Sequence, residues 1–252
     1  MRVAIDCSHH PVPGGVRTYL DNLVPALSRV GPELDLDLYY RTPRSPSVLP
    51  EYPHARSRVA HVPGSRRLWS WVERQFDWPP IELHCGDLDV VHGTHFTLPA
   101  ARRARRVLTV HDVAYLKHPE LYADRRLNEY GYRTLLQNSL AGADLVLAIS
   151  HHTRNDLIVE CGVDPERVWV VPFGWDQRLV RRPEEIWRPE VEALGIDRPF
   201  VLYPAGSIDV RKNIDRVLEG HHSMDAIVPA KRDLHNYQKQ VVGGLGFATQ
   251  PE

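Results

Sequence analysis

Six short apolar runs, separated by polar or glycine-containing turns and by segments with helical periodicity, recur through the first two thirds of the chain. They are RVAIDC (2–7), LDLDLYY (34–40), LDVVHG (88–93), RVLTVH (106–111), DLVLAIS (144–150) and RVWVVP (167–172). Strands that alternate with helices are typical of a parallel sheet, because parallel neighbours need a crossover connection. The pattern therefore predicts an α/β fold, a Rossmann-like parallel sheet with helices on both faces.

Four segments with helical periodicity lie along the same part of the chain, at residues 15–30, 65–77, 123–141 and 151–161. We expect residues 1–177 to form one N-terminal Rossmann-like domain. Residues 178–198 are rich in charge, contain two prolines and show little strand character, which favours a linker or an exposed helix between domains.

The composition argues against several classes of protein. With 42% hydrophobic and 25% charged residues, the 252-residue chain falls in the range of globular proteins. Its net charge of -1 gives no global field that would attract nucleic acid or an acidic membrane. The three cysteines are widely spaced and form no C-x-x-C pair, which indicates a reducing compartment. The first ten residues match neither a secretory signal nor a membrane span, so we expect a cytoplasmic protein.

Gly14 and Gly15 follow the first predicted strand and open the first predicted helix. Without a Cβ, the backbone there can approach a ligand and offer its N–H groups to a phosphate oxygen. A glycine loop that merely connects strand to helix fits the same residues. The loop has no G-x-G-x-x-G, so an NAD-binding fingerprint is not supported.

His111 and Asp112 directly follow the run RVLTV, at the edge of the sheet where open α/β folds bind their ligands. The alternative is structural, with His111 hydrogen-bonded at a strand end and Asp112 forming a turn. Ser150 ends another run and precedes a predicted helix, which favours an N-cap. If that helix end faces the cleft, Ser150 is also a candidate for substrate contact.

Other polar clusters give weaker signals. His92, His95 and the pair His151-His152 match no spacing typical of metal ligands, so a metal-dependent hydrolase is kept only as a third alternative. The basic run at residues 102–106 has no interleaved aromatic residues and is interpreted as a solvated surface rather than a nucleic-acid site. The amphipathic segment from Arg66 to Trp78 is expected to pack on the sheet, with its surplus tryptophans available to a lipid or an acceptor.

Residues 199–220, PFVLYPAGSIDVRKNIDRVLEG, are predicted to be the first strand, turn and helix of a second nucleotide-binding domain. Arg211 and Lys212 stand where the predicted helix begins, which is a plausible cradle for an anion. Residues 221–252 show no sustained period, and they hold 1 arginine and 2 lysines, against 26 and 2 in residues 1–220. We expect an unrelated, disordered tail and an incomplete second domain.

Several motifs, taken in order, resemble the GT-B glycosyltransferases of family 4, also called glycosyltransferase group 1. The resemblance covers nearly all of residues 1–220. Trp175 stands where the V-P-x-G-V-D segment of the family has a small aliphatic residue. The motifs are the Gly14-Gly15 loop, VVHGTHFTLP, RRVLTVHDVAYLKHPELY, DLVLAISHHTRNDL, VVPFGWD and YPAGSIDVRKN.

The resemblance implies a two-domain enzyme that transfers a sugar from a nucleotide diphosphate to an acceptor, with retention of configuration and without an essential metal or cofactor. It implies that Gly14 and Gly15 lie near the donor phosphates, that His111 contacts the transferred sugar, and that Arg211 and Lys212 neutralise the diphosphate. The acceptor is expected to be a glycan or a lipid-linked molecule, with peripheral contact at the inner face of the membrane. No nucleic-acid partner is expected.

Two departures from the family limit the resemblance. Ser207 follows the glycine of the second-domain turn, where many relatives have arginine. The family's two glutamates, seven residues apart, have no counterpart, since Glu252 is the sole glutamate after Glu219. We therefore expect a truncated or frame-disrupted enzyme. The main alternative is a non-catalytic domain of the same fold that binds a glycan, a lipid or a protein.

We expect little or no sugar transfer from the 252 residues alone, because donor binding in this fold needs both domains. Incubation of the purified chain with UDP- and GDP-sugars and candidate acceptors should release no nucleotide above a protein-free blank. Clear enzyme-dependent turnover would contradict this expectation.

Overall fold

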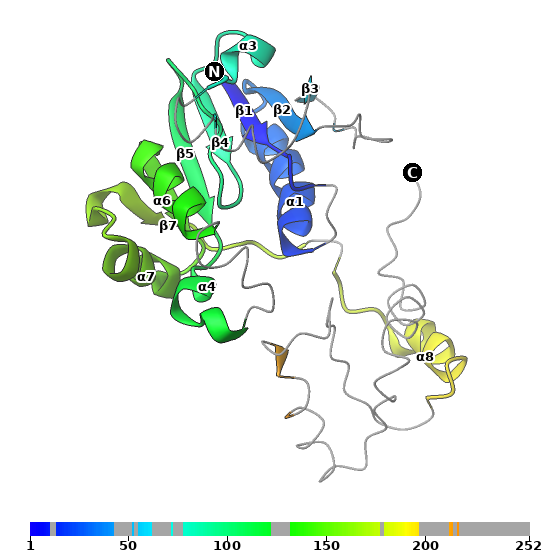
Figure 1. The fold of residues 1–252 in the computed structure, drawn as a ribbon. Helices are drawn as coiled ribbons and strands as arrows, with labels where there is room; N and C mark the ends of the chain where they lie inside the picture. Colours follow the sequence, from blue (N-terminus) through cyan, green and yellow to red (C-terminus); the bar gives the residue numbers. More distant parts are fainter. Residues whose placement is uncertain are drawn as a thin grey trace. The chain divides into compact units, whose positions relative to one another are not determined.

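Seven strands form a single sheet in which every neighbouring pair is parallel (Figure 1). The order across the sheet is β3-β2-β1-β4-β5-β6-β7. The strands are β1 (Arg2–Asp6), β2 (Asp35–Thr42), β3 (Ala55–His61), β4 (Val90–Gly93), β5 (Arg105–Val110), β6 (Leu145–Ala148) and β7 (Val168–Val170). This sheet and its helices confirm the predicted α/β class.

The structure, a computed structural model, describes residues 1–10, 14–42, 52, 55–61, 72, 78–121, 132–176, 179–196, 212–213 and 216. The chain divides into two units, Met1–Gly174 and Trp175–Glu252, and the sheet belongs to the first. Among the described residues, no helix has the length and apolar character needed to cross a bilayer.

The helices match the sequence prediction closely where they can be compared. The first unit has α1 (Gly15–Val30), α3 (Glu82–Cys85), α4 (Ala114–Lys117), α6 (Arg133–Gly142) and α7 (His151–Cys161), with 3-10 turns at Pro119–Leu121 and Pro165–Arg167. The predicted bounds of α1 and α7 are confirmed. The second half of the predicted helix at 123–141 corresponds to α6. The predicted helix at 65–77 lies outside the described residues except for Val72.

The register of the strands separates the two faces of the sheet. Ile5 pairs with His92 and His92 pairs with Val107, so these three side chains share one face. On that face α1 buries Leu20 and Val24 against β1 and β2. Burial of side chains of this size contributes about 1.5–3 kcal/mol each.

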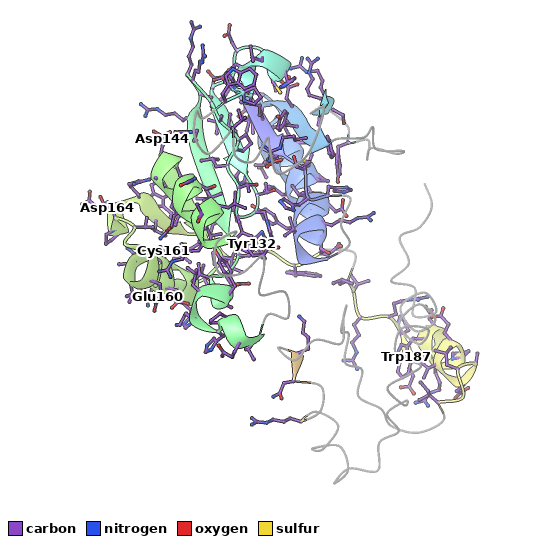
Figure 2. All side chains as sticks on the ribbon, in the orientation of Figure 1. Tyr132, Asp144, Glu160, Cys161, Asp164 and Trp187 are labelled. Atoms are coloured by element: carbon purple, nitrogen blue, oxygen red, sulfur yellow. The ribbon has the colours of Figure 1, made fainter. Side chains whose placement is uncertain are left out.

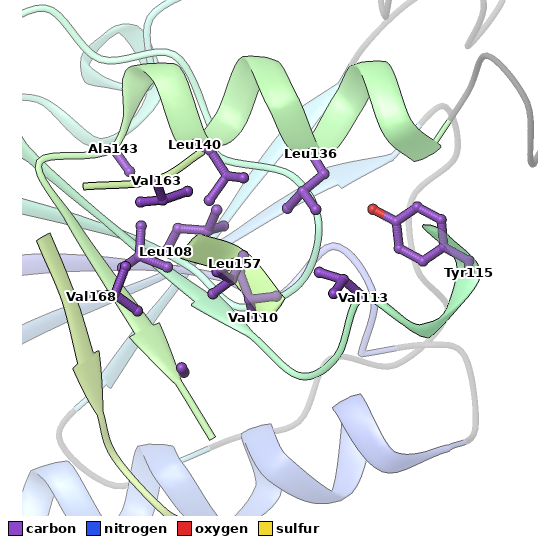
Figure 3. Close-up of a cluster of buried hydrophobic side chains, with 12 residues drawn as sticks. Leu108, Val110, Val113, Tyr115, Leu136, Leu140, Ala143, Leu157, Val163 and Val168 are labelled. Carbon is purple, nitrogen blue, oxygen red and sulfur yellow. The ribbon is translucent and has the colours of Figure 1, made fainter. Parts of the chain in front are cut away.

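The opposite face carries the core beneath α6 and α7 (Figure 3). Leu108 and Val110 of β5 point to this face because they alternate with Val107 and Thr109. The cluster consists of apolar side chains from β5, β6, β7, α6, α7, α4 and the segments that follow β5, α6 and α7: Leu108, Val110, Val113, Tyr115, Leu136, Leu140, Ala143, Val146, Ala148, Leu157, Val163 and Val168.

Strand β3 was not predicted from the sequence, because ARSRVAH has no apolar run. The strand pairs with β2, where Asp37 is fully buried. The carboxylate of Asp37 accepts hydrogen bonds from Arg56 Nε at 3.1 Å, Arg58 Nε at 3.3 Å and Arg2 Nη2 at 2.9 Å. Charge compensation therefore takes the place of an apolar face here.

The second unit is described mainly through α8 (Glu184–Glu192). This helix lies inside residues 178–198, for which the sequence favours a linker or an exposed helix between domains, and it fits the second alternative. The division into domains stays a prediction. Its first turn carries Glu184 and Glu185, whose charges suit a helix amino end, and Arg188 pairs with Glu184 one turn along. The predicted strand, turn and helix at 199–220, apart from Lys212, Asn213 and Arg216, and the predicted tail at 221–252 lie outside the described residues.

Gly93→Ala should destabilise the first unit by about 1–3 kcal/mol, because a Cβ there would stand 2.6 Å from the carbonyl oxygen of Thr97. Gly15→Ala is the matched control, since its added Cβ meets nothing within 4 Å and alanine favours the helix. Urea unfolding of both variants, followed through amide signals of the sheet, would compare them. Equal unfolding midpoints would contradict the close packing at Gly93.

Candidate functional site

The carboxyl ends of all seven strands face one edge of the sheet, and the strand order reverses between β1 and β4. Crossovers from β1 and from β4 leave in opposite directions, and open α/β sheets bind their ligands outside the carboxyl ends of the strands at such a reversal. Four segments begin at this edge: the loop after β1, residues 94–96 after β4, residues 111–113 after β5 and residues 171–174 after β7.

Gly14 and Gly15 place an open helix end at this edge. Gly14 is the N-cap of α1 and has a φ of 152°, a conformation that favours glycine, and it has no side chain with which to cap the helix. Both glycines are exposed, and the first turn contains no acidic residue. His10 of the same loop is held by Asp21 of α1, with Nε2 and Oδ1 2.8 Å apart. The arrangement presents uncapped N–H groups suited to an anion.

His111 is held in one orientation and one protonation state. Its Nε2 lies 2.9 Å from the carbonyl oxygen of Thr94, and because a carbonyl can only accept, Nε2 carries the proton and Nδ1 is left as an acceptor. Burial lowers the pKa of His111, partly offset by the Thr94 carbonyl and by the charge of Asp112. The imidazole is therefore neutral at pH 7.

Three aromatic rings surround this imidazole. Tyr19 of α1 lies edge-on to it, with ring centroids 5.3 Å apart, and Phe173 lies at the same distance. Tyr19 and Phe173 stack on each other at 4.7 Å with an interplanar angle of 28°. His95 completes the group at 6.2 Å from His111.

A series of hydrogen bonds between polar side chains holds the Tyr19 ring in place. The hydroxyl of Tyr19 lies 3.3 Å from Thr109 Oγ1, which is also 2.8 Å from Nε2 of His92. On the next segment, Thr94 Oγ1 donates to the carbonyl oxygen of Asp6 at 2.6 Å. Sequence reasoning missed Tyr19, Thr94, Thr109 and Phe173 as members of the site. Thr94, Thr109 and Phe173 lie at or just beyond the carboxyl ends of strands, and this position in the sequence could have indicated them.

His92 is buried and His95 is partly buried, and both are neutral at pH 7. Burial, followed by repulsion from His111 when that ring is protonated in acid, lowers the pKa of His92 to about 4. Burial, then His9 and His111, lowers the pKa of His95 to about 3. Within the described ranges, Nδ1 of His95 has no hydrogen-bond partner, and no group of three or more His, Cys, Asp or Glu residues could hold a metal ion.

Asp112 and Ser150 both make local hydrogen bonds at the same edge. Asp112 Oδ1 accepts from the backbone N–H of Ala114 at 3.0 Å. Ser150 Oγ accepts from the N–H of Thr153 at 3.0 Å, which confirms the predicted N-cap of α7. Contact of either residue with a substrate stays a prediction.

The two cations predicted to bind phosphate belong to the second unit. Arg211 lies outside the described residues, and Lys212 is exposed. Their role therefore also stays a prediction.

The basic run at 102–106 lies at the opposite, amino edge of the sheet. Arg105 Nη1 donates to Asp144 Oδ1 at 2.9 Å, and the N–H of Arg106 donates to the same carboxylate at 2.8 Å (Figure 2 labels Asp144). Glu82 Oε1 accepts from the backbone N–H groups of Arg102 and Arg103. This part of the run is built into the amino edge, away from His111.

Comparison with protein families matches Glycosyltransferase Family 4 over residues 13–178. A search of curated protein sequences found no significant match.

Several solved structures share the fold. Sucrose-phosphate synthase from Thermosynechococcus elongatus is 15% identical with a TM-score of 0.59, over 97% of this chain and 69% of that one. Anabaena Alr3699/HepE in complex with UDP-glucose is 16% identical with a TM-score of 0.53, over 99% and 67%. The lipopolysaccharide outer core galactosyltransferase WaaB is 13% identical with a TM-score of 0.51, over 98% and 65%.

The sheet described above matches the N-terminal Rossmann-like half of the GT-B fold. The chain spans about two thirds of the length of these structures. The predicted resemblance to the family 4 GT-B enzymes is thereby confirmed.

Acid should destabilise the first unit. In the unfolded chain the imidazoles of His92 and His95 take up protons near pH 6.5, whereas the folded chain keeps them neutral down to about 4 and about 3. The two histidines therefore make their full contribution to the free energy of unfolding above about pH 6.5, and this contribution is lost as the pH falls. Between pH 7 and pH 5 we expect a loss of about 2 kcal/mol for each histidine.

The measurement is the free energy of urea unfolding at both pH values. His92→Asn should reduce the loss between pH 7 and pH 5 by about 2 kcal/mol. His118→Asn, at an exposed histidine, is the control for the effect of the substitution itself. A loss as large in His92→Asn as in the original chain would contradict the assignment.

Proposed function

The chain belongs to glycosyltransferase family 4, and we propose that its first unit supplies the sugar-facing half of a site that transfers a sugar from a nucleotide diphosphate to an acceptor, with retention of configuration. The observation that carries this proposal is the fixed, neutral imidazole of His111 at the carboxyl edge. Because His111 contacts Tyr19 near the start of α1, it lies on the same edge as the open amino end of that helix.

In this proposal the first unit contacts both the transferred sugar and the diphosphate of the donor. The Nδ1 atom of His111 accepts a hydrogen bond from a hydroxyl group of the transferred sugar. The N–H groups at Gly14 and Gly15 face the diphosphate, on which negative charge grows as the bond to the sugar breaks. In well-studied sites one preorganised donor lowers such a barrier by about 3–4 kcal/mol.

The remaining contacts complete the proposed scheme. Arg211 and Lys212 of the second unit supply positive charge to the departing diphosphate, and Asp112 and Ser150 flank the sugar. The scheme uses charge and hydrogen bonds alone and needs no metal ion or cofactor.

The proposed substrates follow from the family and from the named neighbours. One similar structure is a complex with UDP-glucose, which supports a nucleotide-sugar donor, and another is named as a lipopolysaccharide galactosyltransferase, which supports a glycan or lipid-linked acceptor. Sugar transfer is proposed for both units together and not for the first unit alone. Acceptor binding without any nucleotide-sugar response would favour the alternative, a non-catalytic binding domain.

The role of His111 is tested by NMR titration of the 252-residue chain with a panel of UDP- and GDP-sugars, and with UDP and GDP alone. Because the first unit supplies only part of the proposed donor site, we expect weak binding by this chain. It should show as shifts at the Gly14 and Gly15 amides with the nucleotides, and as additional shifts at the His111 imidazole with the matching nucleotide sugar. His111→Ala should weaken binding of that sugar nucleotide about threefold to tenfold, to the level of the bare nucleotide, because one hydrogen bond is lost.

His84→Ala is the matched control. His84 is an exposed histidine of α3, at the amino end of the sheet (Figure 1), and its loss should leave every affinity unchanged. Equal affinities of His111→Ala and the original chain for all nucleotide sugars would contradict the proposed role.

A further inference from the structure

We propose that Phe173, supported by Tyr19, is a stacking surface for the apolar face of a pyranose ring, with Nδ1 of His111 beside it as the acceptor for a ring hydroxyl. This inference rests on the proposed function and adds to it the residue that recognises the sugar ring itself. The pyranose comes either from the donor or from the acceptor glycan, and both sources present the same chemistry.

Phe173 is positioned by ring contacts rather than by the sheet. The last ladder bond of this segment runs from the N–H of Val171 to the carbonyl oxygen of Ala148, at 2.8 Å. Pro172 follows and has no N–H to donate. Phe173 then stacks on Tyr19 and stands 5.3 Å from His111, yet 44% of its surface is exposed. A stacked aromatic pair contributes about 0.5–1.5 kcal/mol beyond burial, enough to favour this orientation.

Tyr19 makes this surface rigid. Its hydroxyl is anchored on Thr109 Oγ1 at 3.3 Å, and Thr109 is itself held by His92. Burial raises the pKa of Tyr19, so the phenol stays neutral in its pocket. One face of the Phe173 ring therefore lies on a fixed support, which leaves the exposed remainder of the side chain for a ligand.

The chemistry of the three side chains selects the class of ligand. A pyranose has one face of C–H bonds, which suits the negative face of an aromatic ring, and a rim of hydroxyl groups. Nδ1 of His111 adds one hydrogen-bond acceptor next to the rings. The three side chains bring no positive charge for a phosphate, and a purely apolar lipid chain would leave that acceptor unpaired. A sugar ring uses both features.

The experiment titrates the chain by NMR with methyl pyranosides of glucose, galactose, mannose and N-acetylglucosamine, with the matching nucleotide sugars, and with UDP and GDP alone. Phe173→Leu keeps apolar volume but removes the aromatic face, and Phe173→Tyr restores it. Trp169→Leu is the matched control, because Trp169 is an exposed aromatic residue of β7, four residues before Phe173, with 61% of its surface exposed. Unchanged amide spectra of β1, β4 and β5 show that each variant is folded.

We expect Phe173→Leu to weaken pyranose binding about threefold to tenfold, and Phe173→Tyr and Trp169→Leu to stay within about twofold of the original chain. Affinity for UDP and GDP should not change in any of them. Weakening seen with nucleotide sugars alone assigns the surface to the donor sugar, and weakening with methyl pyranosides assigns it to the acceptor. Either result supports the inference.

Two outcomes would overturn it, and they are distinct. If His111→Ala weakens sugar binding while Phe173→Leu binds as the original chain does, the stacking surface is wrong and the proposed function stands. If the original chain gives no response to any pyranoside or nucleotide sugar, the stacking surface and the proposed function both fail.

Discussion

The parallel pairing of β1 with β4 is the constraint on which the rest of the structure depends. It joins the half of the sheet that runs through β2 and β3 to the half that runs through β5, β6 and β7. Because all strands point the same way, the open end of α1 and the residues after β4 and β5 meet at one edge. Buried apolar faces on both sides of the sheet hold this arrangement, so the geometry of the edge follows from the core.

Polar groups inside the sheet connect this core to the site. The face that carries Ile5 also carries His92 and Thr109, and Thr109, itself hydrogen-bonded to His92, anchors the hydroxyl of Tyr19. Desolvation keeps the buried imidazoles neutral, which makes them hydrogen-bonding residues rather than charges. These neutral side chains and aromatic rings suit the recognition of hydroxyl groups and ring faces that we propose. For negative charge it offers the helix end at Gly14, and the remaining cations are proposed to come from the second unit.

Much of the fold could be predicted from the sequence, because strands buried on both faces appear as continuous apolar runs. That signal located β1, β2 and β4 to β7, and failed at β3, where Arg56 and Arg58 are compensated by a carboxylate on another strand. His111 was found for a similar reason, since it ends a recognisable run. Tyr19 and Phe173 could not be found in this way. Their contact joins a helix after β1 to a segment after β7, and only the folded sheet brings these together.

The role of the carboxyl edge in sugar binding can be tested by a crystal structure of the chain bound to the nucleotide sugar or pyranoside with the highest affinity. We expect a sugar ring at the carboxyl edge, with one hydroxyl at about 2.6–3.2 Å from Nδ1 of His111. A sugar bound at the amino edge near Asp144, or a carboxyl edge left empty while the sugar binds elsewhere, would contradict it.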